Sequence, residues 1–183
     1  LTLKDYLEAE KFFRNIISLK PNAENYYIYG NIHKQLKNYK QASEYFLKAI
    51  NLKSDYSEAY NNLGNTKFKL GFIDEAVKNY QQAIKFNKKN IPAYFNLAHV
   101  YSEEKNFYDL KRVLQDVLKF DENNTTALND LGYLNLILGK VDEGRKLFER
   151  VINIDDKHIR AFKNYFLITK VEKENKFLKK LEQ

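Results

Sequence analysis

The chain has 183 residues, a formal net charge of +7 and a mean hydropathy of −0.63. It contains no cysteine, which excludes disulfides, thiol catalysis and cysteine-bound zinc. No apolar run approaches the roughly 18 residues that span a bilayer, so we expect no membrane insertion. Because the chain begins at Leu1 and contains no methionine, we expect its natural start to be absent and leave localisation open, with the cytoplasm as the default.

Four consecutive stretches of the sequence superimpose at a fixed period of 34 residues: 23–56, 57–90, 91–124 and 125–158. The small columns of this alignment hold Gly30, Gly64, Ala98 and Gly132, then Ala42, Ala76, Leu110 and Gly144, then Ala49, Ala83, Val117 and Val151. The large columns hold Tyr26, Tyr60, Tyr94 and Leu128, then Tyr29, Leu63, Leu97 and Leu131, then Phe46, Tyr80, Leu114 and Phe148. A period in this range is typical of a stacked solenoid.

In chain order, the pattern in residues 1–22 predicts one helix, which is the second helix of an incomplete repeat. Its residues lie one position closer to the next copy than the period of 34 demands. Each full copy then predicts a helical hairpin, because its apolar residues recur three and four apart. The turns are expected near residues 37–39, 71–73, 105–107 and 139–141. Another first helix begins at Ile159.

Glycine use predicts two local features. Gly71 and Gly139 should end their first helices in a left-handed conformation, whereas Lys37 and Lys105 occupy the same column and should give strained or differently closed turns. A glycine inside a helix costs about 1 kcal/mol relative to alanine, so the glycine column indicates close contact between helices. The third copy has larger side chains in the small columns, and we expect its two helices to lie further apart.

The residues that carry this pattern resemble the tetratricopeptide repeat. The match is clearest in the second copy, SEAYNNLGNTKFKLGFIDEAVKNYQQAIKFNKKN, with Tyr60 at the aromatic position, then Leu63-Gly64, Ala76 and Tyr80. The resemblance implies an all-α fold, an α-solenoid of stacked helical hairpins, and a protein–protein interaction scaffold or adaptor. An enzyme is not expected. The alternative is the substrate-presenting arm of a larger enzyme such as a glycosyltransferase.

The chain is therefore predicted to be a single solenoid of a partial repeat (1–22), four full repeats and a C-terminal segment (159–183). Phe166 falls in the glycine column and Leu178 in the alanine column, so a further hairpin would be overpacked. We expect the segment to be a long or bent helix instead. It should cover the apolar end of the fourth repeat with Phe162 and Tyr165.

In tetratricopeptide arrays the first helices line a concave groove that receives a peptide, and the resemblance implies the same here. The candidate peptide-binding residues on this face are Tyr27, Asn31, Asn62, Asn65, Phe95, Asn96, His99, Asp130, Tyr133, Leu136 and Asn164. A ladder of carboxamides can both donate to and accept from the main chain of an extended peptide. We expect Asn62 and Asn96 to point into solvent when no ligand is bound. The arrangement is similar to the asparagine ladder of O-linked N-acetylglucosamine transferase arrays, although ordinary repeats also carry asparagine here.

The sequence predicts no catalytic residue, cofactor or metal site. His33, His99 and His158 lie in different repeat positions without metal-ligand spacing, and no phosphate-binding, zinc-protease or nucleophile motif is present. We expect His33 to be a packed ring with one hydrogen bond.

The sequence also bears on partners. The chaperone-binding subset of the family grips a C-terminal carboxylate with cations, but the matching places hold Tyr27, Asn31, Asn62, Pro92 and Asn96. No Hsp70 or Hsp90 tail is therefore expected. Homo-oligomerisation through the open ends of the solenoid is a further possibility, because the first predicted helix lacks its hairpin partner.

The positive charge is uneven along the chain. Residues 1–90 carry 15 basic and 9 acidic side chains, residues 91–158 carry 9 and 12, and residues 159–183 carry 7 and 3. Nucleic-acid binding needs cations clustered on one face, whereas these lysines are spread over turns and outer faces. We therefore expect a solvated surface, including the tract from Lys170 to Lys180. Nucleic-acid binding through the basic N-terminal half stays the less favoured alternative.

Overall fold

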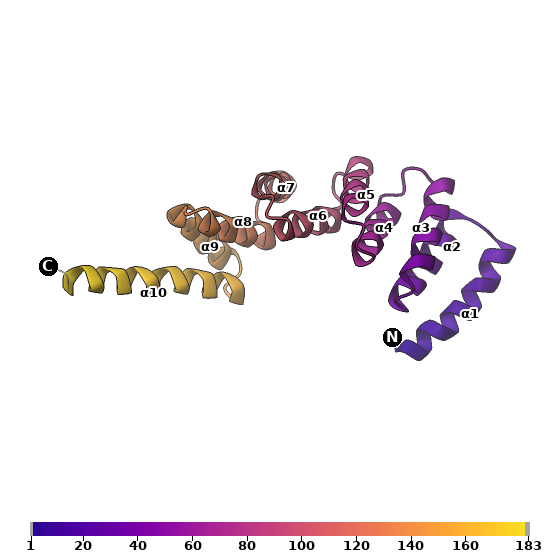
Figure 1. Ribbon diagram of the computed structural model, residues 1–183, viewed down its shortest axis with the longest axis horizontal. Coiled ribbons are helices and arrows are strands. Elements are labelled where there is room, and N and C mark those ends of the chain that lie inside the picture. Colours follow the sequence, from indigo (N-terminus) through magenta and orange to yellow (C-terminus); the bar gives the residue numbers. More distant parts are fainter. Residues whose placement is uncertain (1, 182–183) are drawn as a thin grey trace. The chain divides into compact units, whose positions relative to one another are not determined.

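The computed structural model describes the backbone of residues 2–181 and the side chains of residues 2–170. All regular structure in this part of the chain is α-helical, as the period predicts (Figure 1). The helices are α1 (Leu3–Leu19), α2 (Ala23–Gln35), α3 (Tyr39–Leu52), α4 (Ser57–Lys69), α5 (Ile73–Phe86), α6 (Ile91–Glu103), α7 (Phe107–Phe120), α8 (Thr125–Ile137), α9 (Val141–Ile154) and α10 (Ile159–Leu181).

The chain divides into two compact units, residues 1–100 and 101–183. In the first unit each helix from α1 to α4 packs on the helix that follows it, and α2 also touches α4. In the second unit α7 packs on α8, α8 on α9, and α10 on both α8 and α9. The division falls within α6. Consecutive helices inside each unit therefore stack as hairpins, which confirms the fold class.

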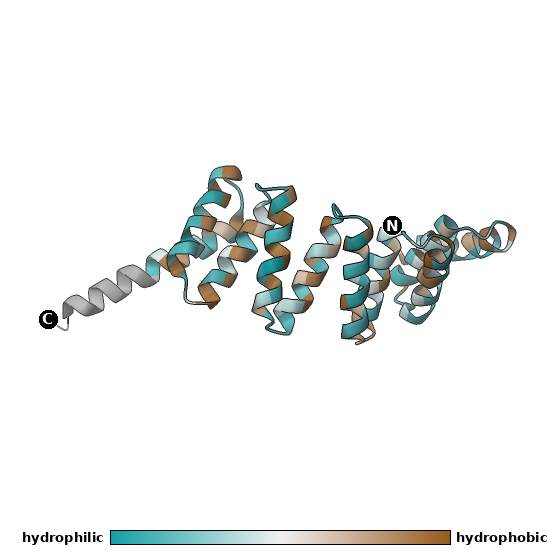
Figure 2. Ribbon diagram, turned by 90° about the horizontal axis from the view of Figure 1, so that it is seen from above, coloured by the Kyte–Doolittle hydropathy of each residue, from teal (hydrophilic) through white to brown (hydrophobic). Residues whose placement is uncertain are grey.

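The large columns of the repeat form the core of both units. Each residue of the second and third large columns is at most 8% exposed: Tyr29, Leu63, Leu97, Leu131, Phe46, Tyr80, Leu114 and Phe148. Hydrophobic and hydrophilic residues alternate along the helices, as expected of helices with one buried face (Figure 2). In the first large column Tyr94 and Leu128 are buried, whereas Tyr26 and Tyr60 are partly buried. The burial of the other columns in all four copies confirms the alignment on which the fold prediction rests.

The glycine column is where the two helices of a hairpin come closest. A Cβ atom placed on Gly30 would lie 2.7 Å from Cε1 of Phe46, and one on Gly64 would lie 2.6 Å from Cε1 of Tyr80. Gly132 has the same relation to Phe148, at 2.8 Å. Real Cβ atoms do not approach other atoms so closely, because interiors have little slack. The helix contact inferred from the sequence is confirmed in these three hairpins.

All four hairpin turns close in the same way. They occupy residues 36–38, 70–72, 104–106 and 138–140, about one residue earlier than predicted. Lys37 and Lys105 have φ values of 61° and 54°, in the left-handed region where Gly71 and Gly139 also lie. In the first turn Asn38 N–H donates to the His33 carbonyl (2.9 Å), and in the second Phe72 N–H donates to the Lys67 carbonyl (2.9 Å). The expectation of a different closure is therefore wrong, and the lysine turns are strained versions of the glycine turns.

Helices α1 and α10 flank the four hairpins. Helix α1 packs on α2, and the Tyr29 hydroxyl donates to Glu10 Oε1 at 2.7 Å. Helix α10 is one continuous helix, so the expected long helix is found. It buries Ala161 and Ile168, with Tyr165 partly buried, against Phe148 and its neighbours.

Phe162 does not cover the fourth repeat, contrary to the prediction. It is 41% exposed, because Ala161 and Ile168 mark the face of α10 that meets α8 and α9, and Phe162 lies off this face. The side chain of Leu178 lies outside the described residues. The wider spacing expected for the third hairpin stays a prediction, because the division between the units falls within its first helix, α6.

The glycine contact can be tested in the first hairpin. Gly30→Ala gains about 0.5–1 kcal/mol of helix propensity but overpacks against Phe46 at a cost of about 1–3 kcal/mol, so the net free energy of unfolding should fall. The third copy has Ala98 and Leu114 in these columns. Gly30→Ala with Phe46→Leu should therefore lose at least about 0.5 kcal/mol less than the sum of the single changes. Urea unfolding measures the cycle, and strictly additive effects would contradict the contact.

The strained turns give a second prediction. Lys37→Gly should raise the free energy of unfolding by about 0.5–1 kcal/mol, because glycine adopts a positive φ without steric cost. Lys78→Gly, at an exposed position inside α5, is the matched control and should lower it by about 1 kcal/mol. If both changes destabilise the chain equally in urea, the lysine turn carries no strain.

Candidate functional site: a polar groove in the first unit

A groove of about 380 Å³ opens among the helices of the first unit. Helices α2, α4 and α6, the first helices of their repeats, contribute most of its residues, and α3 and α5 contribute one each. The lining residues are Lys34, Gln35, Tyr39, Asn65, Phe68, Lys69, Tyr80, Asn96 and His99. This set is called the polar groove below. It brings together three of the predicted site residues, namely Asn65, Asn96 and His99.

Asn62 is held in a network beside the polar groove rather than pointing into solvent. Its Nδ2 donates to Tyr27 Oη at 3.1 Å and to Asn31 Oδ1 at 2.9 Å. Its Oδ1 accepts from Lys34 Nζ at 2.9 Å. The expectation of a free Asn62 is wrong, because the stacked first helices bring polar side chains of neighbouring repeats within hydrogen-bonding distance of one another.

The same inter-repeat hydrogen bond recurs along the chain. Asn96 Nδ2 donates to Asn61 Oδ1 at 2.8 Å, which corrects the expectation that Asn96 points freely into solvent. Three asparagines donate a hydrogen bond from Nδ2 to the side chain of a residue 35 positions earlier in the sequence. The pairs are Asn62–Tyr27, Asn96–Asn61 and Asn164–Asn129. The asparagine column therefore has a structural role in joining repeats, whatever it binds.

Asn65 has a different partner. Its Oδ1 accepts from the hydroxyl of Tyr80 at 2.8 Å, within its own hairpin. Burial raises the pKa of Tyr80, so this hydroxyl stays protonated and remains a donor. The amide nitrogen of Asn65 is left to face the polar groove.

The polar groove carries positive charge. Lys34 is half-buried, and burial lowers the pKa of its ammonium. Lys69 and His99 are exposed, and the His99 ring lies 5.5 Å from the ring of Phe68. No carboxylate is among the described residues that line the polar groove.

The remaining predicted residues lie elsewhere. Tyr27 and Phe95 are half-buried in the first unit, and the Tyr27 ring packs 4.9 Å from that of Tyr56. In the second unit Asn129 Nδ2 donates to Asp130 Oδ1 at 3.3 Å, and burial raises the pKa of Asp130. Tyr133 is 54% exposed, whereas Leu136 and Asn164 are half-buried.

The sequence prediction omitted several residues of the polar groove. Lys34 and Phe68 share one column of the alignment, on the face already chosen, and could have been included on that ground. Tyr39 begins a second helix and Lys69 ends a first helix, so a rule based on the first-helix face alone could not find them.

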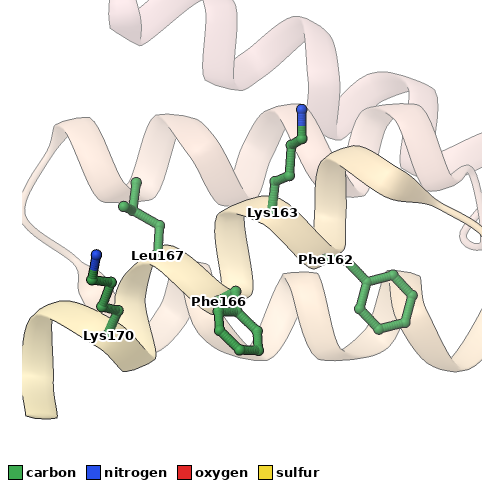
Figure 3. A pocket seen from close by; sticks show the side chains of 5 residues that line it. All are labelled: Phe162, Lys163, Phe166, Leu167 and Lys170. Carbon is green, nitrogen blue, oxygen red and sulfur yellow. The ribbon is translucent and has the colours of Figure 1, made fainter.

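Two further surfaces expose apolar side chains. On α10 a shallow depression is lined by Phe162, Lys163, Phe166, Leu167 and Lys170 (Figure 3). On α1 the residues Leu3, Leu7, Phe12 and Leu19 are each at least half exposed. Self-association through these ends stays a prediction.

His33 is buried, as expected, but without the expected hydrogen bond. Its ring stacks on Tyr45 at 5.2 Å and meets the edge of Tyr29 at 4.6 Å. Both ring nitrogens lack a hydrogen-bond partner among the described residues, because aromatic rings enclose them, and burial lowers the pKa of His33. Over the same part of the chain, no group of histidines and carboxylates could hold a metal ion. None of the helices searched there is apolar enough over sufficient length to cross a bilayer.

Comparisons with known proteins identify the repeat. A TPR repeat model matches residues 30–71 and 65–104, and a tetratricopeptide repeat model matches residues 91–124 and 125–158. The last two ranges coincide with the third and fourth copies of the period.

Curated relatives share the repeat over part of their length. A TPR repeat-containing protein of Methanocaldococcus jannaschii is 31% identical over 170 residues, which cover 84% of this chain and 29% of that protein. A human protein O-mannosyl-transferase is 28% identical over 138 residues, covering 74% of this chain and 15% of the enzyme. The chain thus spans less than a third of either relative.

Solved structures share the fold. The crystal structure of MamA gives a TM-score of 0.76 at 22% identity, covering 86% of this chain and 92% of that one. YrrB, a TPR protein with an unusual peptide-binding site, gives a TM-score of 0.70 at 23% identity, covering 88% of this chain and 84% of that one. The likeness of the asparagine columns to the O-linked N-acetylglucosamine transferase array stays an interpretation of the sequence.

The network around Asn62 predicts a stability effect. Asn62→Ala should lower the free energy of unfolding by about 1–3 kcal/mol, because it leaves Lys34 and Asn31 without their partner. Asn96→Ala removes one hydrogen bond and should cost about 0.5–1.5 kcal/mol. Lys78→Ala on exposed α5 surface is the control, with an effect within about 0.5 kcal/mol. Urea unfolding that finds Asn62→Ala indistinguishable from this control would contradict the network.

Proposed function

Because the chain belongs to the tetratricopeptide repeat family, we propose that it is a binding scaffold whose polar groove holds a peptide segment of a partner protein. Tetratricopeptide repeats imply protein–protein interaction, and YrrB is a peptide-binding member of this fold. The observation that carries the proposal is the polar groove itself. It places the apolar surface of Phe68 beside the open amide of Asn65 and the exposed ring of His99.

A peptide suits this arrangement on physical grounds. Polar groups of an extended main chain can pair with side-chain amides, while an apolar side chain of the ligand can pack on an aromatic ring. Aromatic anchors commonly carry much of the binding free energy of such interfaces. The proposal assigns no catalytic step and no cofactor to the chain.

A second candidate function is the repeat arm of a larger enzyme. The similarity to a human protein O-mannosyl-transferase, of which this chain spans 15%, favours it. In that case the polar groove would present substrate to a catalytic domain elsewhere in the same protein. The full-length open reading frame would decide between a separate scaffold and an arm.

The proposal can be tested with a displayed library of random peptides. Peptides selected on the whole chain should bind through the polar groove, so Phe68→Ala should weaken their affinity about ten-fold or more by removing an apolar contact. Fluorescence anisotropy measures the dissociation constant, and circular dichroism checks that the helices persist.

Lys78→Ala, on the exposed surface of α5, is the control and should leave the affinity unchanged. If Phe68→Ala is folded and binds the selected peptides as tightly as the unaltered chain, the polar groove is not the binding site. A library that yields no binder would also count against the proposal.

A further inference from the structure

Most of the described asparagine side chains around the polar groove use their amide oxygen as an acceptor within the protein. Asn96 is the exception, because its Nδ2 is the donor to Asn61. The Oδ1 atoms of four asparagines already accept from protein groups: Asn31, Asn61, Asn62 and Asn65. Among the residues whose side chains are described, Asn62 is the only one of these four that uses its Nδ2 as a donor. The amide nitrogens of Asn31, Asn61 and Asn65 donate no hydrogen bond to any described residue, and Asn65 is the one of these three that lines the polar groove. These asparagine side chains therefore offer a ligand mainly hydrogen-bond donors, although a carboxamide can both donate and accept.

Lys34 adds a charge to this set of donors. Its ammonium has three N–H donors, and its one hydrogen bond goes to the neutral oxygen of Asn62. It is half-buried and makes no ion pair with a carboxylate among the described residues. Burial lowers its pKa, as expected for a cation that has lost water without gaining a counter-charge. The neighbouring Lys67, by contrast, is paired with Glu75 at 2.8 Å.

We propose that the polar groove selects acidic peptide segments, with an Asp or Glu carboxylate of the ligand bound by Lys34 beside the free amide of Asn65. This rests on the proposed function, because it names the class of peptide that the same groove takes. A carboxylate offers only acceptors, which matches a lining rich in donors. A basic peptide would bring a further cation beside Lys34 and Lys69.

This site differs from the carboxylate grip of the chaperone-binding repeats. The places of that grip hold Tyr27, Asn31, Asn62, Pro92 and Asn96, and none of them is a cation. Lys34 lies outside this set, about one turn after Asn31 on α2. The occupant is also unlike nucleic acid, which needs a row of cations along a backbone rather than the lysines of one small groove.

The composition of selected peptides tests this inference. Peptides from a random displayed library that bind the whole chain at low salt should be enriched in Asp and Glu. Replacing the acidic residues of a selected peptide by Asn and Gln should weaken binding about ten-fold. The affinity should also fall as salt rises, since the ion pair is partly exposed to solvent.

Matched variants assign the effect to Lys34. With Lys34→Met the acidic peptide and its amide version should bind equally, whereas Lys34→Arg should retain the preference because it keeps the charge. Lys37→Met, at the nearby exposed turn, should leave the preference unchanged. Circular dichroism checks that each variant is folded.

The outcomes separate the two proposals. If the selected peptides lose affinity with Phe68→Ala but show no acidic enrichment, the acidic preference is wrong and the proposed function stands. If they bind Phe68→Ala unchanged, the proposed function itself fails. A single-stranded oligonucleotide that displaces the acidic peptide at similar concentration would show a general polyanion site and overturn the inference.

Discussion

The close approach of the two helices in a hairpin is the constraint on which the other features depend. The rings of Phe46, Tyr80 and Phe148 lie so close to the glycines Gly30, Gly64 and Gly132 that a Cβ atom on any of these glycines would clash with the facing ring. Because the two helices of each hairpin lie close together at this contact, the first helices of neighbouring repeats can stack with their polar faces aligned. The polar groove of the first unit follows from that stacking.

Alignment of the first helices also explains why some polar side chains on this face form hydrogen bonds with one another. Three asparagines each reach a residue 35 positions earlier. Asp130 occupies the same column of the alignment. The residue 35 positions before it in the sequence is Phe95, whose side chain has no hydrogen-bonding group, so the pattern of pairs does not continue at Asp130. Two of these three bonds are accepted by carboxamide oxygens and one by the Tyr27 hydroxyl, and Asn62 also donates to the carboxamide oxygen of Asn31. The acceptors used in this way are no longer open to a ligand. A donor-rich face with a half-buried lysine is thus a consequence of how the repeats are joined.

Much of the fold could be predicted from the sequence, because a repeated pattern samples the same packing four times. The buried columns, the turns and the long C-terminal helix all follow from it. Single positions were less predictable. The positive φ of Lys37 depends on the backbone closure that all four turns share, and the exposure of Phe162 depends on which face of α10 meets α8 and α9. For the candidate site, three residues named from the sequence, Asn65, Asn96 and His99, line the polar groove. The sequence could not show that Asn62 and Asn96 were already bonded, since such partners come from a neighbouring repeat.

The central claim is that the polar groove offers donors and a cation to an acidic peptide. A crystal structure of the chain with a selected acidic peptide tests it most directly. We expect a ligand carboxylate within hydrogen-bonding distance of Lys34 Nζ, with the bonds between Asn62, Tyr27 and Asn31 unchanged. A peptide bound on the apolar surface of α10, or one in the groove with no carboxylate near Lys34, would contradict the account.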